Sequence, residues 1–210
     1  LSAVDGSLKR LGTDYLDVLL LHRPDALMEP EEVAEAFDEL EKSGKVRHFG
    51  VSNEDPYTME LLQSALHQPI CANQLQMSLT NATMIAQPMN TNICDGLNPV
   101  LDNGVLNYCR LHNITIQTWS PFQYGFFEGV FIGSDKYPEL NHCLEEIADK
   151  YRTTPTTIAA AWILRHPAKM QAVTGTINPK RLRDCAAALD ITLAREDWYA
   201  LYLAAGYRLP

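Results

Sequence analysis

Short apolar runs recur along this chain, and five of them end on polar or aromatic residues that are able to contact a ligand. The runs cover about residues 15–22, 45–51, 70–74, 114–119 and 170–174. Nearly continuous apolar runs of this length are typical of strands that are buried on both faces of a parallel sheet. Because parallel strands open their carboxyl ends on the same side, these polar ends are expected to share one face.

Amphipathic segments separate the runs and predict helices. Ser7 to Leu11, followed by Gly12, is typical of a last helical turn with a glycine cap. Either Asn53 or Asp55 is expected to cap a helix that begins near Pro56. Further helices are expected over about residues 30–40, 101–112, 140–151, 156–166, 179–189 and 195–204. Alternating strands and helices predict a parallel α/β architecture, and residues 1–210 are interpreted as one domain.

Two stretches lack this periodicity and are predicted to be long loops on the active face. Residues 77–99 are rich in Asn, Thr, Met and Pro, and residues 121–138 hold six aromatic side chains. Long loops in such folds commonly carry function. The aromatic loop is interpreted either as a substrate lid or as a packed connection.

Composition and charge exclude several classes of partner. The chain has 46% hydrophobic and 20% charged residues, which is ordinary for a globular protein, and its net charge of -9 disfavours nucleic acid and anionic membranes. No apolar run approaches the ~18–20 residues that span a bilayer. Residues 1–12 show no secretory signal, so a cytoplasmic protein is expected.

The cysteines favour the same compartment. Five are scattered along the chain without a CxxC pair or any metal-ligand spacing, which predicts reduced structural thiols and no metal site. They are Cys71, Cys94, Cys109, Cys143 and Cys185.

The five strand ends carry motifs that resemble those of one family. In order they read LLLH at 19–22, GKVRHFGVSN at 44–53, NQ at 73–74, WSP at 119–121 and GTINPKR at 175–181. Together they resemble successive strand ends of the aldo-keto reductases, from about residue 7 to the end of the chain. The HRPD sequence at 22–25 is similar to the bacterial oxidoreductase branch.

The resemblance implies a (β/α)8 TIM barrel that reduces aldehyde or ketone carbonyls with NADPH, or with NADH as the alternative. The small-molecule carbonyl substrate would be oriented by His22, the catalytic histidine. The implied cofactor-binding residues are Ser52, Asn53 and Gln74 at the nicotinamide carboxamide, Trp119 on the nicotinamide ring, Ser120 and Phe122 near the pyrophosphate, and Gly175, Thr176, Arg181 and Asp184 around the adenosine phosphate and adenine.

Elementary chemistry agrees with these assignments. A carboxamide needs both donors and acceptors, which a hydroxyl and two side-chain amides supply. The Gly-Thr turn before Pro179 resembles a helix N-terminus that receives a phosphate, and Arg181 offers a planar fork to it. Gly175 replaces a lysine and Cys185 an asparagine that many NADPH-preferring members have, yet Arg181 still favours NADPH.

The family's aspartate, tyrosine and lysine would lie on three strand-helix units that precede these motifs. The chain therefore resembles strands four to eight only, the C-terminal two-thirds of a barrel, and five strands cannot close an eight-stranded barrel. Either about 80–100 residues are missing from a barrel of about 250, or another chain covers the open edges.

Each residue also has a purely structural interpretation. His22 would be a hydrogen-bonded strand end, Ser52 and Asn53 a helix cap, and Trp119 part of the core. A non-catalytic module that senses or binds the nicotinamide cofactor is the alternative function. A barrel hydrolase or aldolase is disfavoured, because no strand end carries paired carboxylates, a Schiff-base lysine or a metal cluster.

Overall fold

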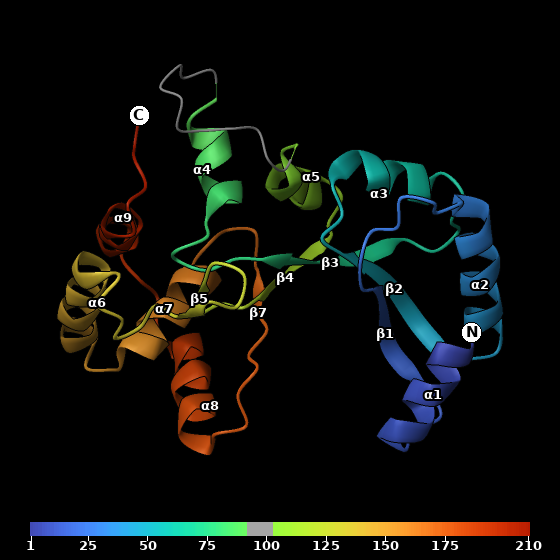
Figure 1. The fold of residues 1–210 in the computed structure, drawn as a ribbon, viewed down its shortest axis with the longest axis horizontal. Coiled ribbons are helices and arrows are strands. Elements are labelled where there is room, and N and C mark those ends of the chain that lie inside the picture. The colour runs from blue at the N-terminus through green and yellow to red at the C-terminus, as the bar shows by residue number, and fades with distance from the viewer. Residues whose placement is uncertain (92–102) are drawn as a thin grey trace. The chain divides into compact units, whose positions relative to one another are not determined.

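The computed structural model describes residues 1–91 and 103–210 (Figure 1). These form two compact units, the first built from residues 1–74 and 107–115 and the second from the described parts of 75–106 and 116–210. The expectations for Cys94 and for the remainder of 92–102 fall outside the described residues. Cys71, Cys109, Cys143 and Cys185 carry free thiols.

The first unit contains three parallel strands joined by helices. After α1 (Ser2–Leu11) come β1 (Leu16–Leu21), α2 (Pro30–Lys42), β2 (Val46–Ser52), α3 (Pro56–Gln63) and β3 (Ile70–Gln76), whose last two residues belong to the second unit. β2 lies between β1 and β3, with Leu21 paired to Val51 and Ser52 paired to Gln74. The predicted parallel α/β arrangement is confirmed here.

The core of this unit fixes α2 on the sheet. Phe37 of α2 stacks on Phe49 of β2, with ring centroids 4.0 Å apart, and both side chains are buried. Gly50 of β2 is required beside β3, because a Cβ atom there would lie 2.6 Å from Ala72 O. Burying side chains of this size contributes roughly 1.5–3 kcal/mol each. α2 accordingly packs along β2 (Figure 1).

Capping decides between two alternatives that the sequence left open. The Asp55 side chain accepts hydrogen bonds from Tyr57 N and Thr58 N at the start of α3. Asp55, not Asn53, is therefore the N-cap, and the Asn53 amide instead donates to Ser52 Oγ at 3.0 Å. Gly12 closes α1 in the left-handed conformation, as predicted.

The second unit combines a short parallel strand pair with helices. Its elements are α4 (Thr83–Met89), α5 (Val105–Leu111, whose C-terminal part belongs to the first unit), β4 (Thr115–Trp119), β5 (Gln123–Tyr124), β6 (Gly129–Val130), α6 (Pro138–Tyr151), α7 (Pro155–Leu164), β7 (Gln171–Ala172), α8 (Pro179–Ala186), a 3-10 turn (Ala187–Asp190) and α9 (Arg195–Ala204). β4 and β7 pair in parallel, and β5 and β6 form an antiparallel hairpin.

Three expectations were wrong in this unit. Residues 83–89 form a helix rather than part of a loop, because Met84, Ile85 and Ala86 are buried and Pro88 comes too late to prevent it. The loop at 121–138 contains the β5–β6 hairpin. The strand expected over 170–174 is shorter, with only Gln171 and Ala172 in β7, although Val173 N still donates to Thr118 O.

Helices α7 and α9 are joined by a pair of tryptophans. Trp162 Nε1 donates to Trp198 O at 3.0 Å, and Trp198 Nε1 donates to Trp162 O at 2.9 Å. The two rings stack with centroids 4.9 Å apart. Each indole N–H thus has a partner in a buried position, which avoids the cost of burying an unpaired donor. Residues 157–163 of α7 are all buried, and all but Thr157 are apolar.

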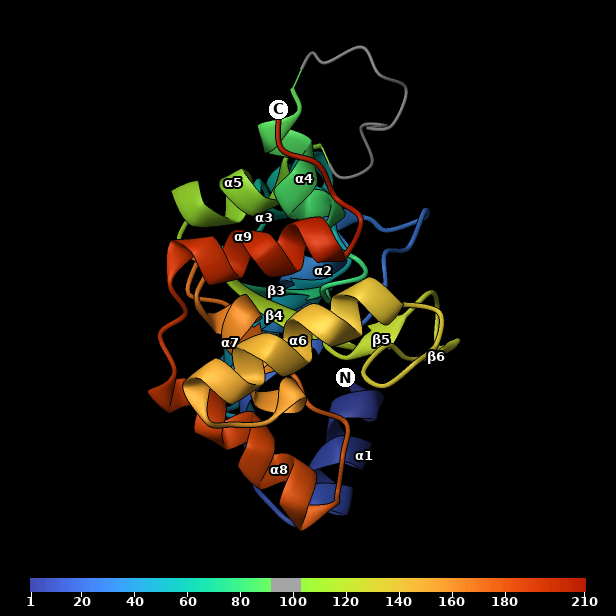
Figure 2. The same cartoon turned by 90° about the vertical axis from the view of Figure 1, so that its left-hand side faces the viewer.

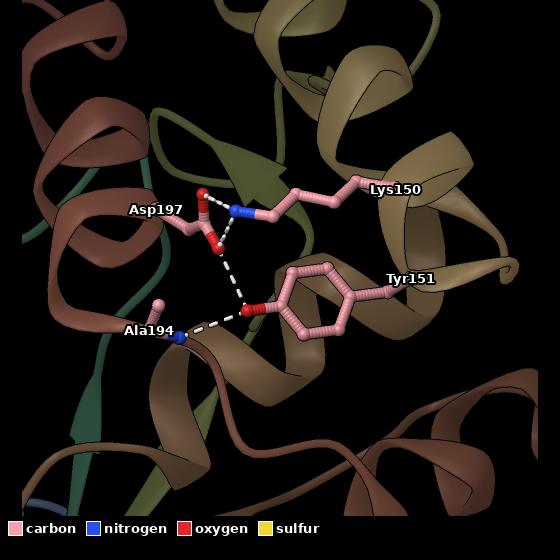
Figure 3. Close-up of polar contacts among 4 residues, drawn as sticks. All are labelled: Lys150, Tyr151, Ala194 and Asp197. Atoms are coloured by element: carbon pink, nitrogen blue, oxygen red, sulfur yellow. Dashed lines mark hydrogen bonds and ion pairs between the residues drawn. The ribbon is translucent and has the colours of Figure 1, made fainter.

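A polar cluster, Lys150–Tyr151–Asp197, holds α6 on α9. Lys150 Nζ lies 2.7 and 2.8 Å from the two carboxylate oxygens of Asp197, and Tyr151 Oη donates to Oδ2 at 2.7 Å (Figure 3). Tyr151 Oη also accepts from Ala194 N at 2.9 Å. Burial would raise the pKa of Asp197, but hydrogen bonds from Lys150 and Tyr151 outweigh it and lower that pKa. The two helices lie side by side in Figure 2.

A second buried group, Glu54, lies between β2 and α3. The residue is 4% exposed, and its backbone oxygen accepts from Asn73 Nδ2 at 2.8 Å. Burial, and secondarily the charge of Asp55, raise the pKa of the Glu54 carboxyl to about 6. Ionised Glu54 therefore destabilises the fold near neutral pH.

Tyr151→Phe is expected to lower the free energy of unfolding by about 1–2 kcal/mol, because it removes one hydrogen bond and leaves Ala194 N–H without its acceptor. Urea denaturation measures the change. Tyr199→Phe, at an exposed residue of the same helix as Asp197, is the matched control. Equal stability of both variants would contradict the role of the cluster.

Glu54→Gln is expected to stabilise the protein by about 1–2 kcal/mol above pH ~6 and little at pH ~4.5. Since the folded pKa of Glu54 lies above its ordinary value of 4.5, the wild-type protein loses stability as pH rises through this window. Melting temperatures across that range test the trend. The exposed Glu39→Gln on α2 should show a flat difference, and a flat difference for Glu54→Gln too would refute the assignment.

Candidate functional site

In the first unit, the candidate residues follow the carboxyl ends of neighbouring strands. His22 is exposed and comes directly after Leu21, which pairs with Val51. The register therefore sets His22 on the same edge of the sheet as Ser52. Parallel pairing, rather than any side-chain contact, brings these two positions to one edge.

Ser52, Asn53 and Gln74 form one hydrogen-bonded set. Ser52 Oγ donates to Gln74 O at 3.0 Å, Asn53 Nδ2 donates to Ser52 Oγ at 3.0 Å, and Asn53 N donates to Gln74 O at 3.1 Å. Ser52 is 1% exposed, whereas Asn53 and Gln74 are half-buried. The buried Ser52 hydroxyl therefore holds the Asn53 side chain in place, and Gln74 enters the set through its backbone oxygen.

The backbone of Asn53 supports a special role for this turn. Its φ of 58° lies in the left-handed region, which non-glycine residues adopt uncommonly and asparagine more readily than most. Such strain is frequent where a turn must aim a side chain. The structure thus brings together three of the predicted nicotinamide contacts.

In the second unit, β4 ends at Trp119, and Ser120 follows it. Trp119 is half-buried, and Ser120 has a φ of 53° while its Oγ donates to Gln123 Oε1 at 2.6 Å. Phe122 contributes its backbone oxygen to Phe131 N, so it anchors the hairpin that follows. The turn after β4 is therefore strained in the same way as the turn after β2.

Two neighbours of Trp119 were not singled out from the sequence. The rings of Phe127 and Phe126 lie 5.8 and 6.2 Å from the Trp119 ring, centroid to centroid. They were expected only as part of an aromatic loop, because the hairpin that positions them has no clear strand pattern. The Gly125 and Gly129 pair around them was the available signal.

The end of β7 leads to the N-terminus of α8. Val173 N donates to Thr118 O at 2.9 Å, and Thr176 Oγ1 accepts from Asn178 N at 3.2 Å. Gly175 is exposed and Thr176 half-buried in this connection. The residues predicted to surround a phosphate therefore lie in the connection between the end of β7 and the start of α8.

Asn178, which sequence reasoning did not single out, caps α8. Its side chain accepts from Lys180 N at 2.9 Å and Arg181 N at 3.3 Å, so these two backbone donors are already paired. Asparagine before proline at a helix start was the signal that identifies such a cap. An anion at this end would therefore be held by side chains such as exposed Arg181 rather than by those amides.

The remaining candidate, Asp184, lies one turn further along α8. Asp184 is half-buried, and its backbone oxygen accepts from Thr157 Oγ1 at 2.8 Å. Burial, and then the charge of Asp184, raise the pKa of the Cys185 thiol, so it is uncharged at neutral pH. Thr157 ties α8 to α7, which fixes the position of Asp184 on the helix.

The Lys150–Tyr151–Asp197 cluster contains the three residue types that the resemblance places upstream. Tyr151 of this cluster has two hydrogen-bond partners. Burial, together with the nearby Asp197, raises the pKa of the Tyr151 hydroxyl. An acid for catalysis needs a free path to substrate and a pKa near the working pH. The cluster is therefore structural.

Within the described residues, no group of three or more His, Cys, Asp and Glu side chains is arranged to hold a metal ion. No helix among those residues is both long and apolar enough to cross a membrane.

Comparison with known proteins agrees with the strand-end motifs. A model of the aldo/keto reductase family matches residues 1–202. The chain is 37% identical to a 6-dehydroglucose reductase of Agrobacterium fabrum over 97% of its own length and 61% of that protein's, and 32% identical to oxidoreductase YdhF of Escherichia coli over 100% and 64%.

Solved structures give the same result. The fold matches an aldo-keto reductase from Klebsiella pneumoniae in complex with NADPH, with a TM-score of 0.76, 26% identity, and coverage of 98% of this chain and 64% of that one. It also matches the thermostable aldo-keto reductase Tm1743, with a TM-score of 0.75, 28% identity, and coverage of 97% and 65%.

This chain spans 61–65% of the length of the first curated relatives it matches. The match nevertheless covers nearly all of its own residues, including every strand end described above. The chain therefore belongs to the aldo/keto reductase family.

Proposed function

We propose that the whole protein is an NADPH-dependent reductase of aldehydes and ketones, to which this chain contributes strands four to eight of a (β/α)8 barrel. The observation that carries the proposal is that Ser52, Asn53 and Gln74 meet at the ends of β2 and β3, where a hydroxyl and two side-chain amides match the donor and acceptor of a nicotinamide carboxamide. Coverage of about two-thirds of each relative supports the assignment of strands.

The other cofactor contacts follow the resemblance residue by residue. Trp119 faces the nicotinamide ring, and Ser120 with Phe122 serves the pyrophosphate side. Arg181, with Gly175, Thr176 and Asp184, serves the adenosine end, where a guanidinium suits a phosphate better than an amide-capped helix start does. The solved relatives that contain NADPH or NADP support NADPH over NADH.

His22 is the catalytic residue of this chain in the proposal. When bound, the cofactor supplies a hydride to the carbonyl carbon. His22 orients the carbonyl oxygen by a hydrogen bond, and that oxygen takes its proton from a tyrosine elsewhere in the whole protein. The exposed strand-end position of His22 leaves its imidazole accessible to a substrate.

His22→Ala in the full-length protein is expected to lower kcat at least about 100-fold while the Kd for NADPH changes little, because the imidazole acts on substrate rather than on cofactor. Steady-state kinetics and nucleotide titration measure the two quantities. His48→Ala, an exposed histidine of β2, is the matched control. Equal losses in turnover and in NADPH affinity would count against the role of His22.

Trp119→Ala is expected to weaken NADPH binding about 3- to 10-fold through loss of ring stacking, and Trp119→Tyr should restore most of it. Titration of nucleotide fluorescence reports the Kd of each variant. An unchanged Kd in Trp119→Ala would end this assignment.

A non-catalytic cofactor-binding module is the alternative. His22 is the one catalytic residue type of the family that the resemblance identifies in this sequence. Tight NADPH binding by the full-length protein without reduction of any carbonyl tested would favour that alternative over the reductase.

A further inference from the structure

Asn73 belongs to the NQ motif at the end of β3, yet the resemblance gives a role only to Gln74. The Asn73 side chain is fully buried in the first unit, and its Nδ2 donates to Glu54 O at 2.8 Å. Gln74 O accepts from Ser52 Oγ and from Asn53 N. The two residues of the motif therefore both bind the turn that follows β2, Gln74 by its backbone and Asn73 by its side chain.

The bond from Asn73 fixes the backbone of this turn. Glu54 is buried, and a buried carbonyl oxygen that has no donor costs free energy. With Nδ2 bonded to that oxygen, the peptide that follows Glu54 keeps one orientation. Asn53, directly before it, has a φ of 58°, a conformation that costs free energy for a residue with a side chain. The Asn73 amide thus supports the strained residue of the turn.

The other contacts of the Asn73 amide are weak. Nδ2 lies 3.5 Å from Met59 Sδ, and Oδ1 has no hydrogen-bond partner among the described residues. Burial raises the pKa of the Cys109 thiol to about 12, and a hydrogen bond with Asn73 opposes that rise. Thiols and thioethers are weak hydrogen-bonding groups, and an unpaired buried oxygen destabilises the fold. The bond to Glu54 O is therefore the main polar contribution of Asn73.

We propose that Asn73 is a positioning residue for the nicotinamide carboxamide: through Glu54 O it holds Asn53 in the left-handed conformation that presents the Asn53 side chain to the cofactor. This inference rests on the proposed function, in which Asn53 contacts that carboxamide. Asn73 is itself too deeply buried to touch the cofactor. Loss of its donor should therefore weaken the nicotinamide contact and leave the adenosine end of the cofactor unaffected.

The experiment compares the Kd for NADPH with the Kd for adenosine 2′,5′-bisphosphate, which has the adenosine end of the cofactor without the nicotinamide. Both are measured on the whole protein, by nucleotide fluorescence and by calorimetry. Asn73→Leu keeps the branched shape of the side chain and removes the donor, whereas Asn73→Ala removes the donor without adding atoms. Cys71→Ala, at a half-buried residue of the same strand, is the matched control.

The Kd for NADPH should rise about 5-fold or more in both Asn73 variants, as the loss of one hydrogen bond predicts, while the Kd for adenosine 2′,5′-bisphosphate changes less than about 2-fold. Both constants should stay unchanged in Cys71→Ala. A residue with a purely structural role would instead affect the two ligands alike, because a loosened fold weakens both ends of the cofactor site.

An equal rise for the two ligands, or an unchanged Kd for NADPH, overturns the positioning role of Asn73 and leaves the reductase assignment intact. A wild-type protein that does not bind NADPH instead overturns the proposed function, and this inference with it. If Asn73→Leu unfolds, Asn73→Ala decides. Unfolding of both variants assigns Asn73 to the fold alone and also overturns the inference.

Discussion

Parallel pairing of β2 with its neighbours is the constraint on which the candidate site depends. With Leu21 opposite Val51 and Ser52 opposite Gln74, the residues that follow each strand must leave from one edge. A slip of one residue would turn every side chain to the other face. Gly50 permits the close approach of β2 to β3 that this register needs. A residue without a side chain therefore determines where Ser52 and Gln74 lie at the edge of the sheet.

The sequence predicted the strands of the first unit to within two residues, because buried parallel strands have a nearly continuous apolar pattern. Its site residues Ser52, Asn53 and Gln74 meet in the structure as one set. Neither prediction needed the positions of side chains. Both depended only on where the strands end, and apolar periodicity locates those ends well.

What escaped the sequence depended on tertiary contacts. The helix at Thr83–Met89 has a proline and polar flanks, and burial of three side chains overrides them. The hairpin that positions Phe126 and Phe127 has strands of two residues each, too short for any period to appear. The Asn178 cap changes how an anion would be held at α8, although the helix itself was expected.

The reciprocal bonds between Trp162 and Trp198 have an optical consequence. Two parallel indoles at 4.9 Å couple their electronic transitions, so the near-ultraviolet circular dichroism of the protein should carry a strong contribution from this pair. Trp119 lies apart from it in a half-buried strand end. Dichroism therefore reports the packing of α9 on α7, while quenching by a small solute reports the more accessible Trp119, and a single sample reports both environments separately.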